Sequence, residues 1–183
     1  MRMTRSTRIA SAFAAALRRL PKEDRTAIEG FLFCVRGVSE WVTLGLSGDP
    51  DPACAVTAPL FLRIEDMGTN EYRCQIRFNL PVARLFSARA LVGIAAHELA
   101  HVRRAARVGK GWHEQFKSRE AAEERAADRL AVRWGFRAEI ACMRRERVLR
   151  VTPMLDRRGP AIMKRIHQRI SRMESGGRLP KEA

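Results

Sequence analysis

The segment His97-Glu98-Leu99-Ala100-His101 constrains this 183-residue chain more than any other part of it. Residues four apart lie one above the other on the same face of an α-helix, so the two histidines can bind one metal ion when the segment is helical. Glu98 then lies one position round the helix, within reach of a water molecule at that metal. Two of the four histidines of the chain fall here. The segment therefore predicts a helix that carries two metal ligands and a general base.

The residues around this segment fit a buried active-site helix. Residues 94–96 and the two residues between the histidines are uncharged, and Ser87 is a suitable N-cap for a helix over residues 91–107. Gly93 leaves room for the close approach of a neighbouring element. Arg103 departs from the zinc-peptidase pattern, in which an uncharged residue is usual at this position. The alternative is a helix with two incidental histidines on a polar face.

A second segment offers carboxylates at helical spacing. A catalytic zinc ion needs a third protein ligand and one open position for water. Glu124 and Asp128 are four residues apart in a stretch of good helix formers over residues 120–134, so both carboxylates share one face of the predicted helix. The alternative is a solvated helix whose charged residues form ion pairs with each other.

With these two segments together, the chain resembles the gluzincin metallopeptidases, whose second helix carries Glu-x-x-Ala-Asp after His-Glu-x-x-His. The matching segment runs from Glu124 to Asp128, and the resemblance covers roughly residues 72–136. It implies that Glu124 completes a zinc site with His97 and His101. It also implies that Asp128 orients one of these histidines through its second ring nitrogen.

Within the gluzincins, the chain resembles particular families. In motif the chain resembles the CAAX-prenyl and heat-shock membrane peptidases, and in the short gap between motifs it is closer to the soluble ImmA/IrrE-type peptidases. All of them imply zinc-dependent hydrolysis of a peptide bond by a metal-activated water, with Glu98 as the general base. The expected cofactor is therefore Zn²⁺, and the expected substrate is a protein or peptide.

A weaker resemblance provides a different third ligand. The SprT-like proteases, which act on proteins attached to DNA, take this ligand from a histidine shortly after the first motif, and His113 matches that position. Phe116 comes one residue early for this pattern, and Glu114 replaces a small residue. The spacing therefore favours Glu124 as the third ligand, with His113 as the alternative.

The charge of the chain points to a further class of partner. The formal net charge is +15, from 35 Lys and Arg against 20 Asp and Glu. Such a charge attracts nucleic acid or other polyanions. The alternative is that the basic residues form solvated helix faces. A basic nucleic-acid-binding protein with a non-catalytic metal site is a second function from another class. Glu98 argues against it, because a structural site needs no base.

Cysteine usage and hydropathy indicate the compartment. The four cysteines are widely separated, with no Cys-x-x-Cys pair, which indicates reduced thiols and excludes a local zinc ribbon. No apolar run approaches the roughly 20 residues of a membrane span. A cytoplasmic protein is predicted. The basic residues over 1–8, followed by an alanine-rich stretch, favour an N-terminal helix, with organelle targeting as the alternative.

The order of the predicted elements gives an α+β fold, with a small antiparallel sheet before the active-site helix and mostly helical N- and C-terminal parts. The resemblance implies that this fold is zincin-like. Residues 60–65 and 72–80 alternate apolar and polar side chains as strands do. The resemblance to zincins implies that the second of these strands receives an extended substrate as an added strand. A helix is expected over residues 22–35. We expect a single domain over residues 1–183, composed of N-terminal helices (1–36), a catalytic core (55–136), C-terminal helices (137–174) and a tail (175–183).

Overall fold

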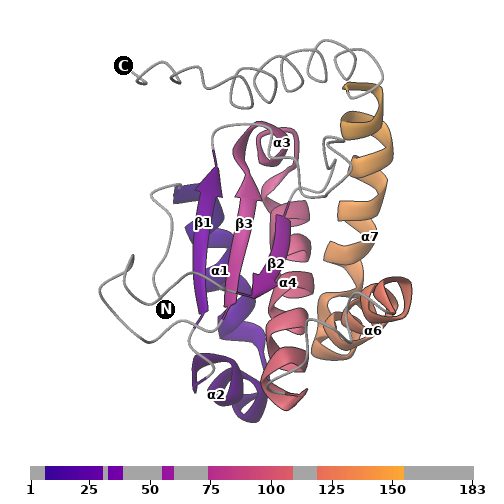
Figure 1. Ribbon diagram of the computed structural model, residues 1–183. Helices are drawn as coiled ribbons and strands as arrows, with labels where there is room; N and C mark the ends of the chain where they lie inside the picture. Colours follow the sequence, from indigo (N-terminus) through magenta and orange to yellow (C-terminus); the bar gives the residue numbers. More distant parts are fainter. Residues whose placement is uncertain (1–6, 31–32, 39–54, 60–73, 109–118, 155–183) are drawn as a thin grey trace, which may run out of the picture.

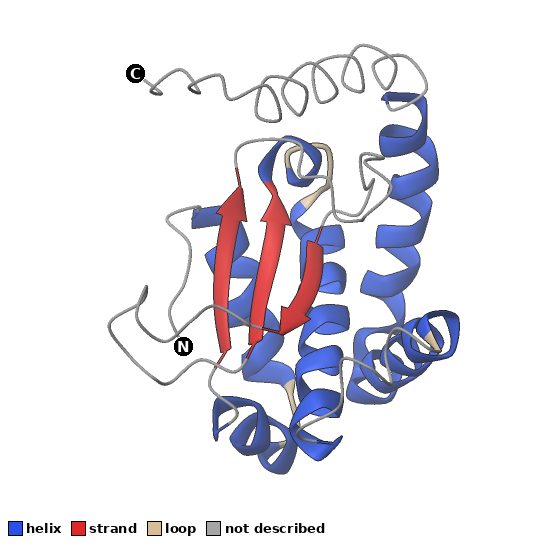
Figure 2. Ribbon diagram, viewed as in Figure 1, coloured by secondary structure: helices blue, strands red, loops and turns tan. Residues whose placement is uncertain are grey.

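The computed structural model describes residues 7–30, 33–38, 55–59, 74–108 and 119–154. This part of the chain is mostly helical, and three short strands form one sheet beside the helices (Figures 1 and 2). The helices are α1 (Thr7–Arg19), α2 (Lys22–Gly30), α3 (Leu80–Ala83), α4 (Ala88–Val108), α6 (Glu120–Ala131) and α7 (Arg137–Glu146). Two short wider-wound segments follow α6 and α7, η2 (Val132–Phe136) and η3 (Arg147–Val151).

The sheet is mixed, not antiparallel as predicted. Its strands are β1 (Phe33–Val38), β2 (Ala55–Pro59) and β3 (Cys74–Asn79), in the order β1-β3-β2. β1 runs parallel to β3, and β2 runs antiparallel to it. The alternation of side chains along a strand says which face is buried and nothing about the direction of its neighbours, so the sequence pattern could not reveal the parallel pair.

The helix expected over residues 22–35 is shorter than predicted. α2 ends at Gly30, and Phe33–Val38 forms strand β1 at an edge of the described sheet. Val35 is buried there with Ile76 of β3 directly opposite. In so short a stretch, the spacing of the apolar residues fits both a helix and a strand. Pairing with β3 favours the strand.

The strand predicted over residues 72–80 is confirmed over Cys74–Asn79 (β3), whereas Leu80 begins α3, and the role expected of the strand is not supported. β3 pairs with β1 along one side and with β2 along the other, so its backbone groups are already used and no substrate strand can be added there. On its buried face, the Phe78 ring meets Phe13 of α1 edge to face, with 5.6 Å between centroids. The strand expected over residues 60–65 lies outside the described residues.

The long helix α4 is the axis on which the other helices pack, with α1, α6 and α7 all in contact with it. Its start matches the prediction, because the Ser87 hydroxyl accepts a hydrogen bond from the backbone N–H of Ala90 at 3.2 Å. Gly93 lies against the backbone of α7, close enough that a β-carbon would be 2.5 Å from the carbonyl oxygen of Glu139. The helix is therefore buried on several sides, as its apolar flanks predicted.

A glycine separates the helices that follow. Gly135 has a φ of +89°, a left-handed conformation that a side chain disfavours, and the chain turns there from α6 and η2 into α7. The predicted end of the helix at this glycine and the new helix near residue 137 are both confirmed. The basic segment at 1–8 lies only partly within the described residues, and α1 begins at Thr7. Among the described helices, none is long and apolar enough to cross a membrane.

Candidate metal centre

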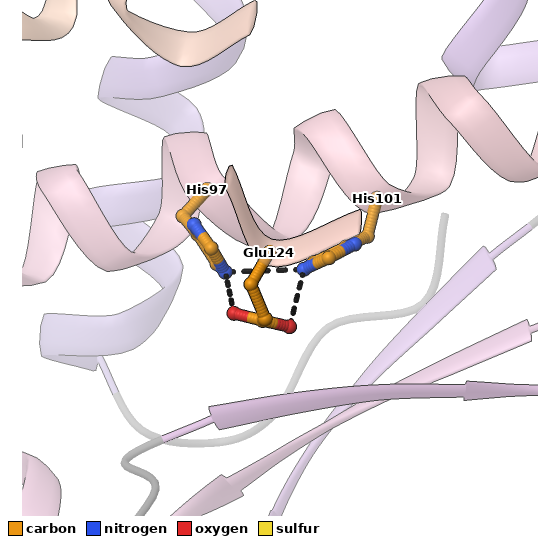
Figure 3. A group of neighbouring side chains, drawn as sticks. All are labelled: His97, His101 and Glu124. Atoms are coloured by element: carbon orange, nitrogen blue, oxygen red, sulfur yellow. Dashed lines mark hydrogen bonds and ion pairs between the residues drawn. The ribbon is translucent and has the colours of Figure 1, made fainter. Parts of the chain in front are cut away.

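Three side chains from two helices converge on one point. His97 and His101 extend from the same side of α4, and Glu124 reaches them from α6 (Figure 3). The two Nε2 atoms are 3.1 Å apart. Glu124 places one carboxylate oxygen 3.1 Å from Nε2 of His97 and the other 3.2 Å from Nε2 of His101. The side chains of His97 and His101 are 12% and 3% exposed, so the centre is largely shielded from solvent on the α4 side.

Asp128 fixes the orientation of His97. One of its carboxylate oxygens lies 2.8 Å from Nδ1 of His97, and the other accepts a hydrogen bond from Arg144 of α7. A carboxylate can only accept, so Nδ1 carries the proton and donates it to Asp128. In the neutral ring the lone pair is then on Nε2, the atom that faces Glu124. This is the contact that the resemblance implied for Asp128.

The electrostatics of the centre favour a positive charge within it. Burial alone would lower the pKa of His97, but hydrogen bonds to Asp128 and Glu124 and the charge of Glu98 outweigh it and raise the pKa to about 10. Burial likewise opposes the ionised form of Glu124, yet His101 and His97 hold the pKa of its carboxyl far below the ordinary range. The ring nitrogens and the carboxylate thus stabilise a cation between them, which is a proton or a metal ion.

These three donor atoms fit a small metal ion that prefers tetrahedral coordination. Metal bonds of about 2.0–2.2 Å to imidazole nitrogen and carboxylate oxygen place neighbouring ligand atoms roughly 3.3–3.5 Å apart in a tetrahedron. The three separations of 3.1 to 3.2 Å are close to that range. Ca²⁺ and Mg²⁺ prefer shells of oxygen and do not fit two imidazoles. His97, His101 and Glu124 could therefore hold a metal ion of the zinc or transition-metal type.

Glu98 is 4% exposed and follows His97 on α4. Its negative charge contributes to the raised pKa of His97, which places it electrostatically within reach of the centre. The general-base role of Glu98 stays a prediction. His113, the alternative third ligand, lies outside the described residues.

The departure at Arg103 has a structural explanation. Its Nε donates to Asp24 of α2 at 2.6 Å, and the same carboxylate accepts a hydrogen bond from Trp134 of η2 at 2.8 Å. Arg103 therefore joins α4 to α2 instead of facing the metal centre. A charged residue at this position is tolerated because its partner comes from another helix.

Two arginine–carboxylate pairs around the centre could not be predicted from the sequence. Arg104 of α4 donates twice to Glu123, at 2.7 Å each, and this bidentate pair holds α4 against α6 one residue before Glu124. Arg144 supports Asp128 from the third helix, α7. Both pairs join residues that are 16 to 19 positions apart, too far for any helical spacing rule to relate them.

Comparison of the chain with protein-family models, curated proteins and solved structures found no match. The chemistry of the centre therefore carries the functional argument.

Proposed function

We propose that this protein is a zinc-dependent metallopeptidase of the gluzincin type, with His97, His101 and Glu124 as the protein ligands. The observation that carries the proposal is the meeting of one carboxylate with two imidazoles at separations near those of a tetrahedral zinc site. The hydrogen bond from His97 to Asp128 supports it, because zinc-binding histidines commonly donate their second ring N–H to a carboxylate.

Each residue has a separate task in this mechanism. Bound zinc would act as a Lewis acid that activates a water molecule and polarises the peptide carbonyl. Glu98 takes the proton from the water at its carboxylate and passes it to the leaving amine. Asp128 keeps the proton of His97 on Nδ1, so that the lone pair of Nε2 would be available to a metal ion. Three protein ligands would leave room for the water that catalytic zinc requires.

The edge strand β2 is a better candidate than β3 for binding the substrate. Since β3 is paired on both sides, an extended peptide would need an edge of the sheet, and β2 is the described edge strand that contacts α4. Within the described residues, β2 pairs with β3 alone, so its other edge can accept a peptide backbone. A peptide bound there would run alongside the helix that carries Glu98.

Metal content and cleavage of a protein substrate such as casein test the proposal together. We expect Glu98→Gln to retain about one zinc per chain and to lose cleavage, because only the base is removed. Glu124→Ala should lose zinc, whereas Glu123→Gln, which changes the neighbouring carboxylate, should retain it because Glu123 contacts Arg104. If Glu124→Ala retained zinc and His113→Ala lost it, His113 and not Glu124 would be the third ligand. Full cleavage by Glu98→Gln would overturn the peptidase mechanism.

A further inference from the structure

The exposed charge on the C-terminal half of the described chain is of one sign. Over residues 121–154 every charged side chain that is exposed is an arginine, and the acidic side chains there are buried or half-buried. These exposed arginines are Arg125, Arg129, Arg133, Arg137, Arg144, Arg145, Arg147 and Arg150. Ordinary solvated helices intersperse both signs, so this distribution needs a reason beyond solubility.

Over residues 121–131 of α6, the acidic and the basic side chains lie on different sides of the helix. Its half-buried acidic residues all turn inward, Glu123 to Arg104 and Glu124 and Asp128 to the histidines. Three arginines at steps of four residues, Arg125, Arg129 and Arg133, lie on its outer side and continue into η2. We call these three residues the arginine row. These acidic side chains contact the metal centre and Arg104, so over residues 121–133 no exposed acidic side chain balances the arginine row.

Within the part of the chain that the structure describes, the arginine row has no ion-pair partner. Among the described residues, none forms a hydrogen bond or an ion pair with these three side chains. Successive members rise by about 6 Å along the helix, which gives a line of guanidinium groups about 12 Å long. A guanidinium binds phosphate through two parallel N–H donors, so such a line suits a polymer whose phosphates are themselves in a row.

We propose that the arginine row binds the phosphate backbone of a nucleic acid. A lipid surface would carry the same phosphate chemistry, but a helix that lies in a membrane presents large apolar side chains beside its basic ones. The exposed large hydrophobic residues of the described chain are Val108, Val148 and Leu149, and none of them lies on α6 or η2. Over residues 121–131 of α6, the exposed residues besides the arginines are alanines at 121 and 122. This surface is separate from the peptidase proposal and does not depend on it.

The test uses the full chain with a labelled 20-nucleotide DNA, single-stranded and duplex, titrated across salt concentrations. Each phosphate contact contributes about −0.9 to the slope of log K against log salt for duplex DNA. The variant R125Q/R129Q/R133Q should therefore flatten the slope by roughly 2.7. With equal binding of the two proteins at about 1 M salt, where the electrostatic contribution vanishes, this slope difference corresponds to about 500-fold weaker binding of the variant at about 0.1 M salt. Its circular dichroism spectrum and thermal unfolding should match those of the wild type, which verifies folding without reference to the metal centre.

The matched control is R18Q/R84Q/R107Q. These three arginines are exposed, and their side chains form no hydrogen bond or ion pair with other described residues. Replacing them lowers the net charge by the same three units, from +15 to +12. The control should weaken binding far less than the row variant. Equal weakening by both variants would show that net charge alone attracts DNA and would overturn the proposal. So would the absence of DNA binding by the wild type, or binding to phosphatidylserine vesicles in its place.

Discussion

The contact between α4 and α7 makes a quantitative prediction at Gly93. A β-carbon at this position would be 2.5 Å from the carbonyl oxygen of Glu139 and 2.7 Å from its carbonyl carbon. Ordinary contact begins near 3.4 Å, so the two helices would have to separate by about 0.9 Å at that oxygen. The opposing atoms belong to the backbone, and no side-chain rotation can relieve the clash.

Two effects of Gly93→Ala have opposite signs. Alanine in the interior of a helix is about 1 kcal/mol more favourable than glycine. Overpacking a filled contact costs roughly 1–3 kcal/mol, and a backbone obstacle puts this case at the upper end or above it. We expect a net loss of roughly 2 kcal/mol in the free energy of unfolding, or about 4–8 °C in Tm for a chain of this size.

Urea and thermal unfolding followed by circular dichroism, with EDTA present so that metal binding does not contribute, would measure this loss. Gly30→Ala is the matched control, because a β-carbon there meets no atom within 4 Å and the change should stay within about 0.5 kcal/mol. A Gly93→Ala protein as stable as the wild type would refute the close packing of α4 on α7.

Three further predictions concern charged groups, two of them at the metal centre and one at the start of α4. Asp128→Ala should lower zinc affinity by about 10- to 100-fold in a competitive chelator assay, and Arg144→Ala, which removes only the support of Asp128, should lower it less; equal losses would contradict this order. Burial lowers the pKa of His97, but hydrogen bonds to Asp128 and Glu124 outweigh it and raise the pKa to about 10. Zinc binding at pH 7.5 should therefore release about one proton from His97, which calorimetry in buffers of different ionisation enthalpy would measure. The absence of proton release would contradict the raised pKa. Burial would raise the pKa of Glu146, but hydrogen bonds from Ser87 and Cys142 lower it below its ordinary 4.5. Its stabilisation is therefore present above pH 4.5 and lost as the pH falls further, and Glu146→Gln should reduce the pH dependence of urea unfolding in that range.

The raised pKa of His97 also has a consequence for stability. In the metal-free protein the protonated ring stabilises the fold fully below its ordinary pKa of 6.5, and this stabilisation is lost as the pH rises towards 10. Urea unfolding of the metal-free protein at pH 6.5 and pH 9.5 should show the decline. His97→Gln should remove it, and an unchanged decline in that variant would assign it to another group.

The limits of the sequence are clearest where one pattern fits two structures. The apolar residues between 28 and 38 satisfy a helical period in their first half and belong to a buried strand in their second, and pairing with β3 decides between the two. The strand over 72–80 could be recognised from its alternation, whereas its central place in the sheet could not. That place depends on which strands reach it, and it removes β3 as a site for an added substrate strand.

The sequence by itself determined the local features of the centre. Two histidines and a glutamate share a helix because they are spaced for one, Ser87 begins that helix, and Glu124 and Asp128 share a face of the next. Only the tertiary structure decided which of these side chains meet. The crossing of α6 over α4 brings the carboxylate to the imidazoles, and α7 supplies the arginine that supports Asp128. Spacing rules extend over about four residues, whereas these contacts depend on how the helices pack, which no short segment specifies.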